Sequence, residues 1–335
     1  MSTEQAPATA PTPAPVAGRR QKSPLDHLIW AGDRFGTLFG FLAMIVLFCI
    51  LRPSTFATID TARSIGESAA PLVVLGVGLT IVMSTGQFDL SFPGIIGIAA
   101  AGAVLLMSDD GVAVVPAVIV AILIGLVAGL IAGVLVATGR ASSFIVTLAL
   151  STIWTGLAIG FSNSRTITGL PSSYTNITFN TVWGVPNAII IALVVSIFGF
   201  ALLRWTVFGR YAQALGSNTD AARLAGIRVS RTLITAFVLL GFCAAITAII
   251  VSSSSGQFSP QIGSGILITP FVAVFFGTSV LAARRFNVFG TVIGTLFIGT
   301  LQTGMVILDL EPWVAEVILG AALILILVPL AKRSR

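Results

Sequence analysis

Residues with reactive side chains are few in this sequence, and their positions exclude several kinds of site. The 335-residue chain has one histidine, His27, and two cysteines, Cys49 and Cys243, which both lie inside apolar runs. A zinc site or a histidine-based catalytic centre needs several such residues together, so neither is expected. The two lysines, Lys22 and Lys332, lie outside any Gly-x-x-x-x-Gly-Lys-Ser/Thr loop. The chain therefore has no usual nucleotide-binding loop, and we expect no metal or cofactor in it.

Asp89 is the most conspicuous acidic residue near an apolar segment. An ionisable group in a bilayer is costly, and so it is by default a candidate for function. Asp89 has three possible roles: an ion pair with an arginine, a cap for the helix expected to start near Ser91, or a place on a translocation pathway. Because Asp89 and Ser91 directly precede an apolar run, we favour the cap and turn role. Glu67 and Glu316 are interpreted as charges at helix ends.

One pattern occurs twice in the chain. Ser84-Thr-Gly-Gln-Phe88 recurs as Ser254-Ser-Gly-Gln-Phe258, 170 residues later, and each copy follows a long apolar run. Glycines 125, 129 and 133 are matched at nearly the same offset by glycines 294, 299 and 304. Close helix packing explains repeated glycines but not Gly-Gln-Phe twice. We therefore interpret the pattern as an internal duplication.

The basic segment 204–232 predicts a short helix over residues 219–225. Asn218 suits the N-cap of this helix, and Gly226 suits the position after its C-cap. Such a helix would expose Arg223. A surface helix that merely closes a long loop would have the same pattern.

The composition indicates that most of the chain lies in a membrane. It is 56% hydrophobic and 9% charged, with a mean hydropathy of +1.03, whereas soluble domains carry roughly 25% charged residues. Most runs are apolar throughout for roughly 17 residues or more, which favours helices over a barrel. We expect an all-α polytopic protein, with a disordered tail over 1–27 and one transmembrane domain over 28–335. The ten expected helices cover residues 35–51, 67–84, 92–107, 113–137, 144–162, 186–203, 233–252, 264–281, 286–308 and 313–331.

The charges predict how these helices cross the bilayer. A net charge of +6 would favour nucleic acid in a soluble protein, but here the basic residues lie at span ends. With the N-terminus inside, only Arg52, Arg63 and Arg165 lie outside, and fifteen of the eighteen basic residues face the cytoplasm. Both termini are then cytoplasmic. The two Gly-Gln-Phe copies lie five spans apart, on opposite sides, which predicts two inverted five-helix repeats over about 35–203 and 204–331.

Four blocks of the sequence resemble the permease subunits of ribose-type bacterial ABC importers, in order between about residues 67 and 330. They are Ser84-Thr-Gly-Gln-Phe-Asp-Leu-Ser91, Gly133-Val-Leu-Val-Ala-Thr-Gly-Arg140 with Phe144-Ile-Val-Thr-Leu148, Ser217-Asn-Thr-Asp-Ala-Ala-Arg-Leu-Ala-Gly-Ile227, and Gly277-Thr-Ser279 with Asn287-Val-Phe-Gly290. The chain departs from the family pattern at Gln87, at Phe92-Pro-Gly94 and at Val280-Leu-Ala-Ala-Arg-Arg285.

The resemblance implies a translocation subunit of the bacterial inner membrane rather than an enzyme. It would move a monosaccharide or similar polyol inward from a periplasmic binding protein, next to a second permease copy, identical or related, within membrane lipid and without nucleic acid. ATP and Mg²⁺ would bind a separate ATPase subunit. Coupling to that ATPase is expected at Asn218, Asp220, Ala221, Ala222, Arg223, Leu224 and Gly226. Candidates for the pathway or gate are Gln87, Phe88, Asp89, Ser91, Gln257, Phe258, Gln302 and Thr303, each of which could equally serve in helix packing.

Other classes of membrane protein fit the sequence less well. Permeases for branched amino acids or nucleosides share the architecture, but the ribose-type blocks favour a sugar. An ion-coupled secondary transporter needs buried ionisable groups, for which Asp89 alone is thin support. An intramembrane enzyme is disfavoured because no expected span holds a histidine or a pair of acidic residues.

Overall fold

A computed structural model describes residues 24–139, 141–280, 285–311, 313–315, 317–318 and 320–321. Within them the chain is almost entirely helical, as the sequence predicts. The helices are α1 (Pro24–Leu51), α2 (Pro53–Phe56), α3 (Ile59–Met83), α4 (Phe92–Ser108), α5 (Val114–Thr138), α6 (Ser143–Phe161), α7 (Ser172–Phe179), α8 (Asn187–Trp205), α9 (Val207–Ser217), α10 (Thr219–Leu224), α11 (Val229–Ser255), α12 (Thr269–Ser279) and α13 (Val288–Ile307), with a 3₁₀ turn, η1 (Ser264–Ile266). The short strands are β1 (Ile167–Thr168), β2 (Thr181–Val182), β3 (Val185–Pro186) and β4 (Gln257–Phe258).

Six of these helices are long and apolar enough to cross a bilayer, namely α3, α5, α6, α8, α11 and α13. Three shorter apolar helical segments, 38–51, 92–108 and 264–279, accompany them. This confirms an all-α polytopic membrane protein. The tail residues 1–23 and most of the span expected at 313–331 lie outside the described residues, as do Arg140, Arg284 and Glu316.

Helices α3 and α11 form the centre of the bundle. In their most apolar windows, 72% of α3 and 61% of α11 is buried, against 17% of α6. Close contact between α5 and α11 depends on glycine, since a Cβ atom at Gly129 would lie 3.0 Å from the Cα of Val238 and 3.2 Å from the Cα of Gly241. The second set of glycines packs elsewhere, with Gly294 of α13 against α12 and Gly304 of α13 against Phe48 of α1.

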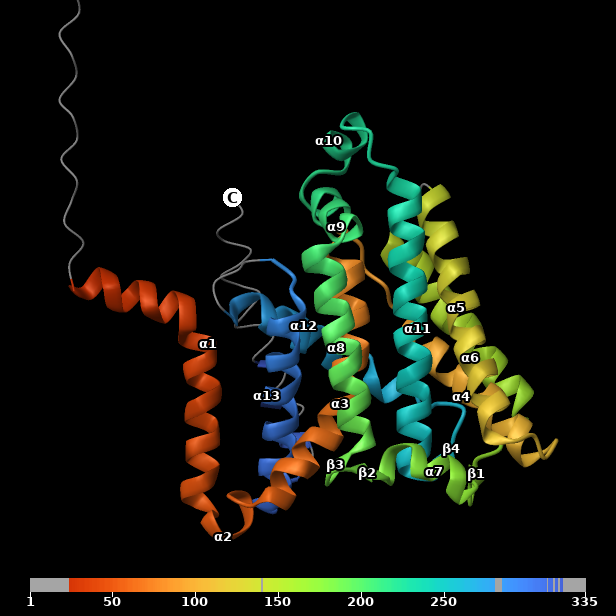
Figure 1. Ribbon diagram of the computed structural model, residues 1–335, viewed down its shortest axis with the longest axis horizontal. Helices are drawn as coiled ribbons and strands as arrows, with labels where there is room; N and C mark the ends of the chain where they lie inside the picture. Colours follow the sequence, from red (N-terminus) through yellow and green to blue (C-terminus); the bar gives the residue numbers. More distant parts are fainter. Residues whose placement is uncertain are drawn as a thin grey trace, which may run out of the picture.

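The two ends of the bundle differ (Figure 1). At one end, called here the α10 end, α9 and α10 project beyond the long helices. At the opposite end, called the strand end, lie α2, α7 and the strand pairs β1–β4 and β2–β3. Residues 163–186 form β1, α7, β2 and β3, and α7 packs against this end of α11. There the Tyr174 hydroxyl shares a 2.7 Å hydrogen bond with the Ser252 hydroxyl, and burial raises the pKa of Tyr174 to about 12.

Several element bounds differ from those expected. Helix α3 begins at Ile59 rather than 67, because Thr58 caps it through a bond from the Thr61 N–H. The segment expected as a loop over 204–232 contains a further helix, α9. The span expected at 264–281 is broken, because the η1 turn precedes α12, which begins only at Thr269 with Pro270 in its first turn. Helix α1 begins at Pro24, inside the segment predicted as tail.

Candidate functional site

The segment 84–91 joins α3 to α4 and is folded by local bonds. Ser84 is the C-cap residue of α3, and its hydroxyl donates to the Thr80 carbonyl at 2.7 Å. Gly86 then reverses the chain with a φ of +79°, a conformation that favours glycine. The same glycine lies against Gly216 of α9, where an added Cβ would be 3.3 Å from the Gly216 Cα. The first Gly-Gln-Phe copy therefore lies at the α10 end.

Asp89 is fully buried within this segment. Its Oδ1 accepts a 2.6 Å hydrogen bond from the Ser91 N–H, the geometry that the turn role requires. The predicted cap role is wrong, because Ser91 is the N-cap residue of α4 and no side chain makes a capping hydrogen bond there. Among the described residues, Oδ2 of Asp89 and the Ser91 hydroxyl have no hydrogen-bond partner, and no basic side chain pairs with Asp89. Asp89 thus shapes the turn before α4 without an ion pair there.

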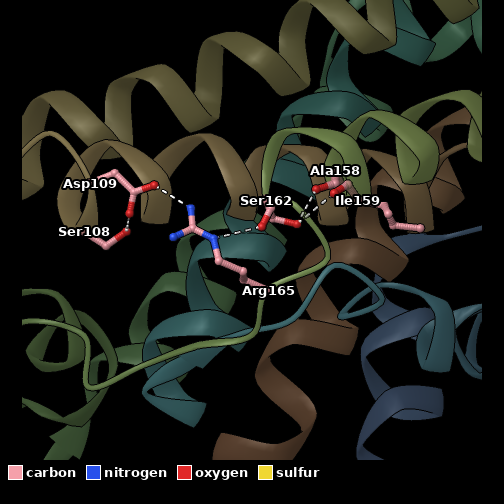
Figure 2. Close-up of polar contacts among 6 residues, drawn as sticks. All are labelled: Ser108, Asp109, Ala158, Ile159, Ser162 and Arg165. Atoms are coloured by element: carbon pink, nitrogen blue, oxygen red, sulfur yellow. Dashed lines mark hydrogen bonds and ion pairs between the residues drawn. The ribbon is translucent and has the colours of Figure 1, made fainter.

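Helix α6 and an ion pair hold this segment and α4 in place. The Leu90 N–H donates to Oγ1 of Thr147 on α6 at 2.9 Å. At the other end of α4, Arg165 donates to Oδ2 of Asp109 at 2.7 Å (Figure 2). This bond from Arg165 lowers the pKa of the Asp109 carboxyl. Helix α4 is therefore fixed at both ends to α6 and the residues that follow it.

The start of α4 meets the start of α12 inside the bundle. The Phe271 ring of α12 lies 6.4 Å from the Phe88 ring and 5.9 Å from the Phe92 ring, between centroids. Gly263 lies directly on the Pro93 carbonyl, with no room for a Cβ. We call these five residues the central junction. It brings together one segment that enters from the α10 end and one that enters from the strand end (Figure 1).

The second Gly-Gln-Phe copy lies at the strand end, far from the first. Gly256 has a φ of +63° and ends α11, as Gly86 follows α3. Gln257 and Phe258 then form β4, which pairs with β1. Phe258 is fully buried and Gln257 is exposed. Gln302 and Thr303 are half-buried on α13. The structure therefore brings Phe88, alone among the predicted pathway residues, into ring contact with α12.

Helix α10 has the caps that the sequence predicts. Oδ1 of Asn218 accepts from the Ala221 N–H at 2.9 Å. At the other end Gly226, with a φ of +82°, donates to the Arg223 carbonyl, and Ile227 donates to the Ala222 carbonyl. This pair of bonds is a Schellman motif, which defines the end of a six-residue helix.

One face of α10 is anchored and the other is open. Ala222 is buried against Leu215 of α9 and Leu233 of α11. Leu224 is 91% exposed, and Arg223 is exposed beside Asp220 at 3.9 Å. An exposed apolar side chain beside a charged pair, on a rigidly held helix, suits docking to another protein.

The sequence interpretation missed α9 and most of the central junction. Polar residues at one face of 207–217 and buried Gly209, Ala212 and Leu215 at the other would have indicated an amphipathic helix. Pro93 and Pro270, each in the first turn of a helix, were the local signal for the junction. The contact of Phe271 with Phe92 had no sequence signal, because 179 residues separate the two rings.

Comparison with known proteins identifies the family. Residues 64–327 match the family described as branched-chain amino acid transport system, permease component. The ribose import permease protein of Bacillus subtilis is 31% identical over 92% of this chain and 96% of its own length. The L-arabinose and D-allose transport system permease proteins of Escherichia coli are 30% and 27% identical, over 88% and 91% of this chain and 89% and 93% of their own. The resemblance of the four sequence blocks is thereby confirmed, and the chain belongs to this permease family, among its ribose-type members.

Proposed function

We propose that this chain is the transmembrane subunit of an ATP-driven importer that moves a monosaccharide or similar polyol into a bacterial cell. The observation that carries the proposal is the match over nearly the whole chain to permeases named for ribose, allose and arabinose. The central junction supports it, since Phe88 is 40% exposed and Phe271 is partly exposed, so both offer aromatic surface. The apolar faces of a sugar ring pack on such surfaces.

An inverted repeat would explain why two similar segments enter the bundle from opposite ends. Gly86 and Gly256 take the same left-handed conformation after α3 and α11, at opposite ends of the bundle. The segments that follow, 87–91 and 257–268, both lead inward to a helix that begins with proline in its first turn. These features support ten spans in two inverted repeats, with the α10 end in the cytoplasm and both termini there, as the basic residues indicate.

Three partners follow from the proposal. A separate ATPase subunit, which holds ATP and Mg²⁺, would dock on α10 through Arg223 and Leu224. A periplasmic binding protein would deliver the sugar at the strand end. A second permease copy, identical or related, would enclose the pathway together with this chain.

A branched amino acid is the second candidate substrate, because the family description names that class. The polar lining expected for either substrate is modest, so the permease alone does not distinguish them. The ribose and L-arabinose permeases reported above are named for sugars, and this favours a sugar.

Transport in proteoliposomes tests the proposal. The permease, purified from its native membrane with its ATPase and binding protein, is reconstituted and supplied with labelled ribose, arabinose, allose or leucine. We expect uptake of a sugar that requires ATP and the binding protein. Uptake of leucine and of none of the sugars would show that the substrate is a branched amino acid. Uptake driven by an ion gradient without the ATPase would show that the chain is not a subunit of an ATP-driven importer.

A further inference from the structure

A cavity of about 570 Å³ opens at the α10 end, between α8, α9 and the start of α13. It lies apart from the central junction and from the exposed face of α10. Three of its residues, Asn287, Val288 and Phe289, belong to a sequence block that the proposed transport role leaves without a function. The cavity therefore needs its own explanation.

The lining of the cavity has two chemically different parts. Phe200 and Leu203 of α8 and Phe289 of α13 supply an apolar wall, and both rings are partly exposed. Arg204, Arg285 and Gln213 supply two guanidinium groups and an amide. A ligand that fills this space must combine an apolar body with a group that accepts hydrogen bonds from cations.

The two arginines lack a counter-charge within the part of the chain that the structure describes. The ion pairs there join Asp60 to Arg63, Asp109 to Arg165 and Asp220 to Arg223. Arg204 and Arg285 are both exposed toward the cavity. Two unpaired cations on one cavity produce a local positive potential that favours an anion.

A neighbouring aromatic residue gives the depth of the cavity in the membrane. Trp205 follows Arg204, is 71% exposed and packs edge-on against Phe200, with ring centroids 5.8 Å apart. Exposed tryptophans at the ends of spans lie at the level of the lipid headgroups. The arginines are therefore at headgroup level, and the apolar wall faces the acyl chains.

We propose that this cavity binds the headgroup of an anionic phospholipid, with the phosphate on Arg204 and Arg285 and the upper acyl chain against Phe200, Leu203 and Phe289. A purely protein contact would not need the apolar wall on the membrane side. Basic pockets between spans recognise anionic headgroups in this way. The bound lipid would join α8 to the start of α13.

Lipid-dependent stability and retention test this proposal. The purified complex is delipidated and then supplied with mixed phosphatidylglycerol and phosphatidylcholine, and its melting temperature and retained lipids are measured. We expect phosphatidylglycerol to raise the melting temperature more than phosphatidylcholine. Arg204→Gln with Arg285→Gln should reduce the retained preference for phosphatidylglycerol about tenfold. Arg204→Lys with Arg285→Lys should keep most of it.

The matched control is Arg228→Gln with Arg231→Gln, which removes the same charge at the same end but outside the cavity. It should keep the lipid preference. If both double variants lose the preference for phosphatidylglycerol equally, the preference comes from surface charge in general, and the proposed site is wrong. An unchanged lipid preference with loss of ATPase co-purification would overturn it in favour of a subunit contact. If the cavity variant does not fold, the two single substitutions are measured, and each should show a partial loss.

Discussion

Asp89 shows how one buried polar side chain can define a turn between two apolar helices. Its Oδ1 satisfies the Ser91 N–H, a donor that lies just before α4 and is buried with it. The charge has no ion-pair partner within the described residues, so the hydrogen bond, rather than the charge, is the contribution that the structure supports.

This distinction predicts different effects for two substitutions. Asp89→Asn keeps an oxygen acceptor for the Ser91 N–H and removes the charge, so the melting temperature should be unchanged or higher. Asp89→Ala leaves a buried donor without a partner, which costs about 1–3 kcal/mol. Thermal unfolding in detergent measures both. Greater damage from Asp89→Asn than from Asp89→Ala would show that the charge itself is needed.

The Asp109–Arg165 pair predicts a small pH dependence at the strand end. The folded-state pKa of Asp109 is lowered, so its contribution to stability is present above the ordinary aspartate pKa, about 3.9, and is lost as pH falls through the folded value. The difference in melting temperature between wild type and Asp109→Asn should therefore disappear in acid. The control is Asp110→Asn, which removes the neighbouring carboxyl without breaking an ion pair among the described residues.

At the scale of elements, the central junction depends on the close approach of two backbones. Its segments come from different parts of the chain, and each includes the first turn of a helix that starts inside the bundle, together with a residue that precedes the helix. The junction tolerates little added volume, because buried packing is dense and Gly263 touches the Pro93 carbonyl.

Two nearby glycines test this contact. Gly263→Ala adds a methyl group where there is no space, and overpacking of this kind costs about 1–3 kcal/mol. Gly265→Ala adds the same group where no atom lies within 4 Å. We expect a lower melting temperature and slower transport for the first variant and wild-type values for the second. Equal behaviour of the two would show that the junction adapts freely.

A substitution on the exposed face of α10 should impair the contact with the ATPase without destabilising the permease. Arg223→Glu changes an exposed side chain and breaks only a surface pair, so the protein should still insert and keep its melting temperature. Association with the ATPase, or stimulation of its activity by the permease, should fall. Arg231→Glu, at the start of α11, is the charge-matched control. Normal transport with unchanged ATPase stimulation in Arg223→Glu would remove α10 from the coupling route.

The sequence predicted helices far better than the tertiary contacts between them. Apolar runs located the spans, and the caps Asn218 and Gly226 located α10, because these signals are local. The break before Thr269 was missed because apolar residues lie on both sides of it. A hydropathy average over this region therefore indicates one continuous span. The contact of Phe271 with Phe88 and Phe92 depends on tertiary packing, which residue types alone do not reveal.

At the scale of the whole molecule, the proposed orientation predicts opposite labelling of two exposed residues. Trp183 is 99% exposed at the strand end, and Leu224 is 91% exposed on α10. After both native cysteines are replaced, Trp183→Cys should react with an impermeant maleimide outside intact cells. Leu224→Cys should react only after the membrane is opened. Reaction of both from the same side would contradict the inverted arrangement.

The contact of Gly263 with the Pro93 carbonyl has a mechanical consequence. Side chains absorb small displacements by changing rotamers, but two main chains in direct contact have no such slack. A shift of the segment around Gly263, which precedes η1 and α12, must therefore push on the first turn of α4, and the far end of α4 is held by Arg165. A displacement on one side of this contact would therefore be passed directly to the main chain on the other side.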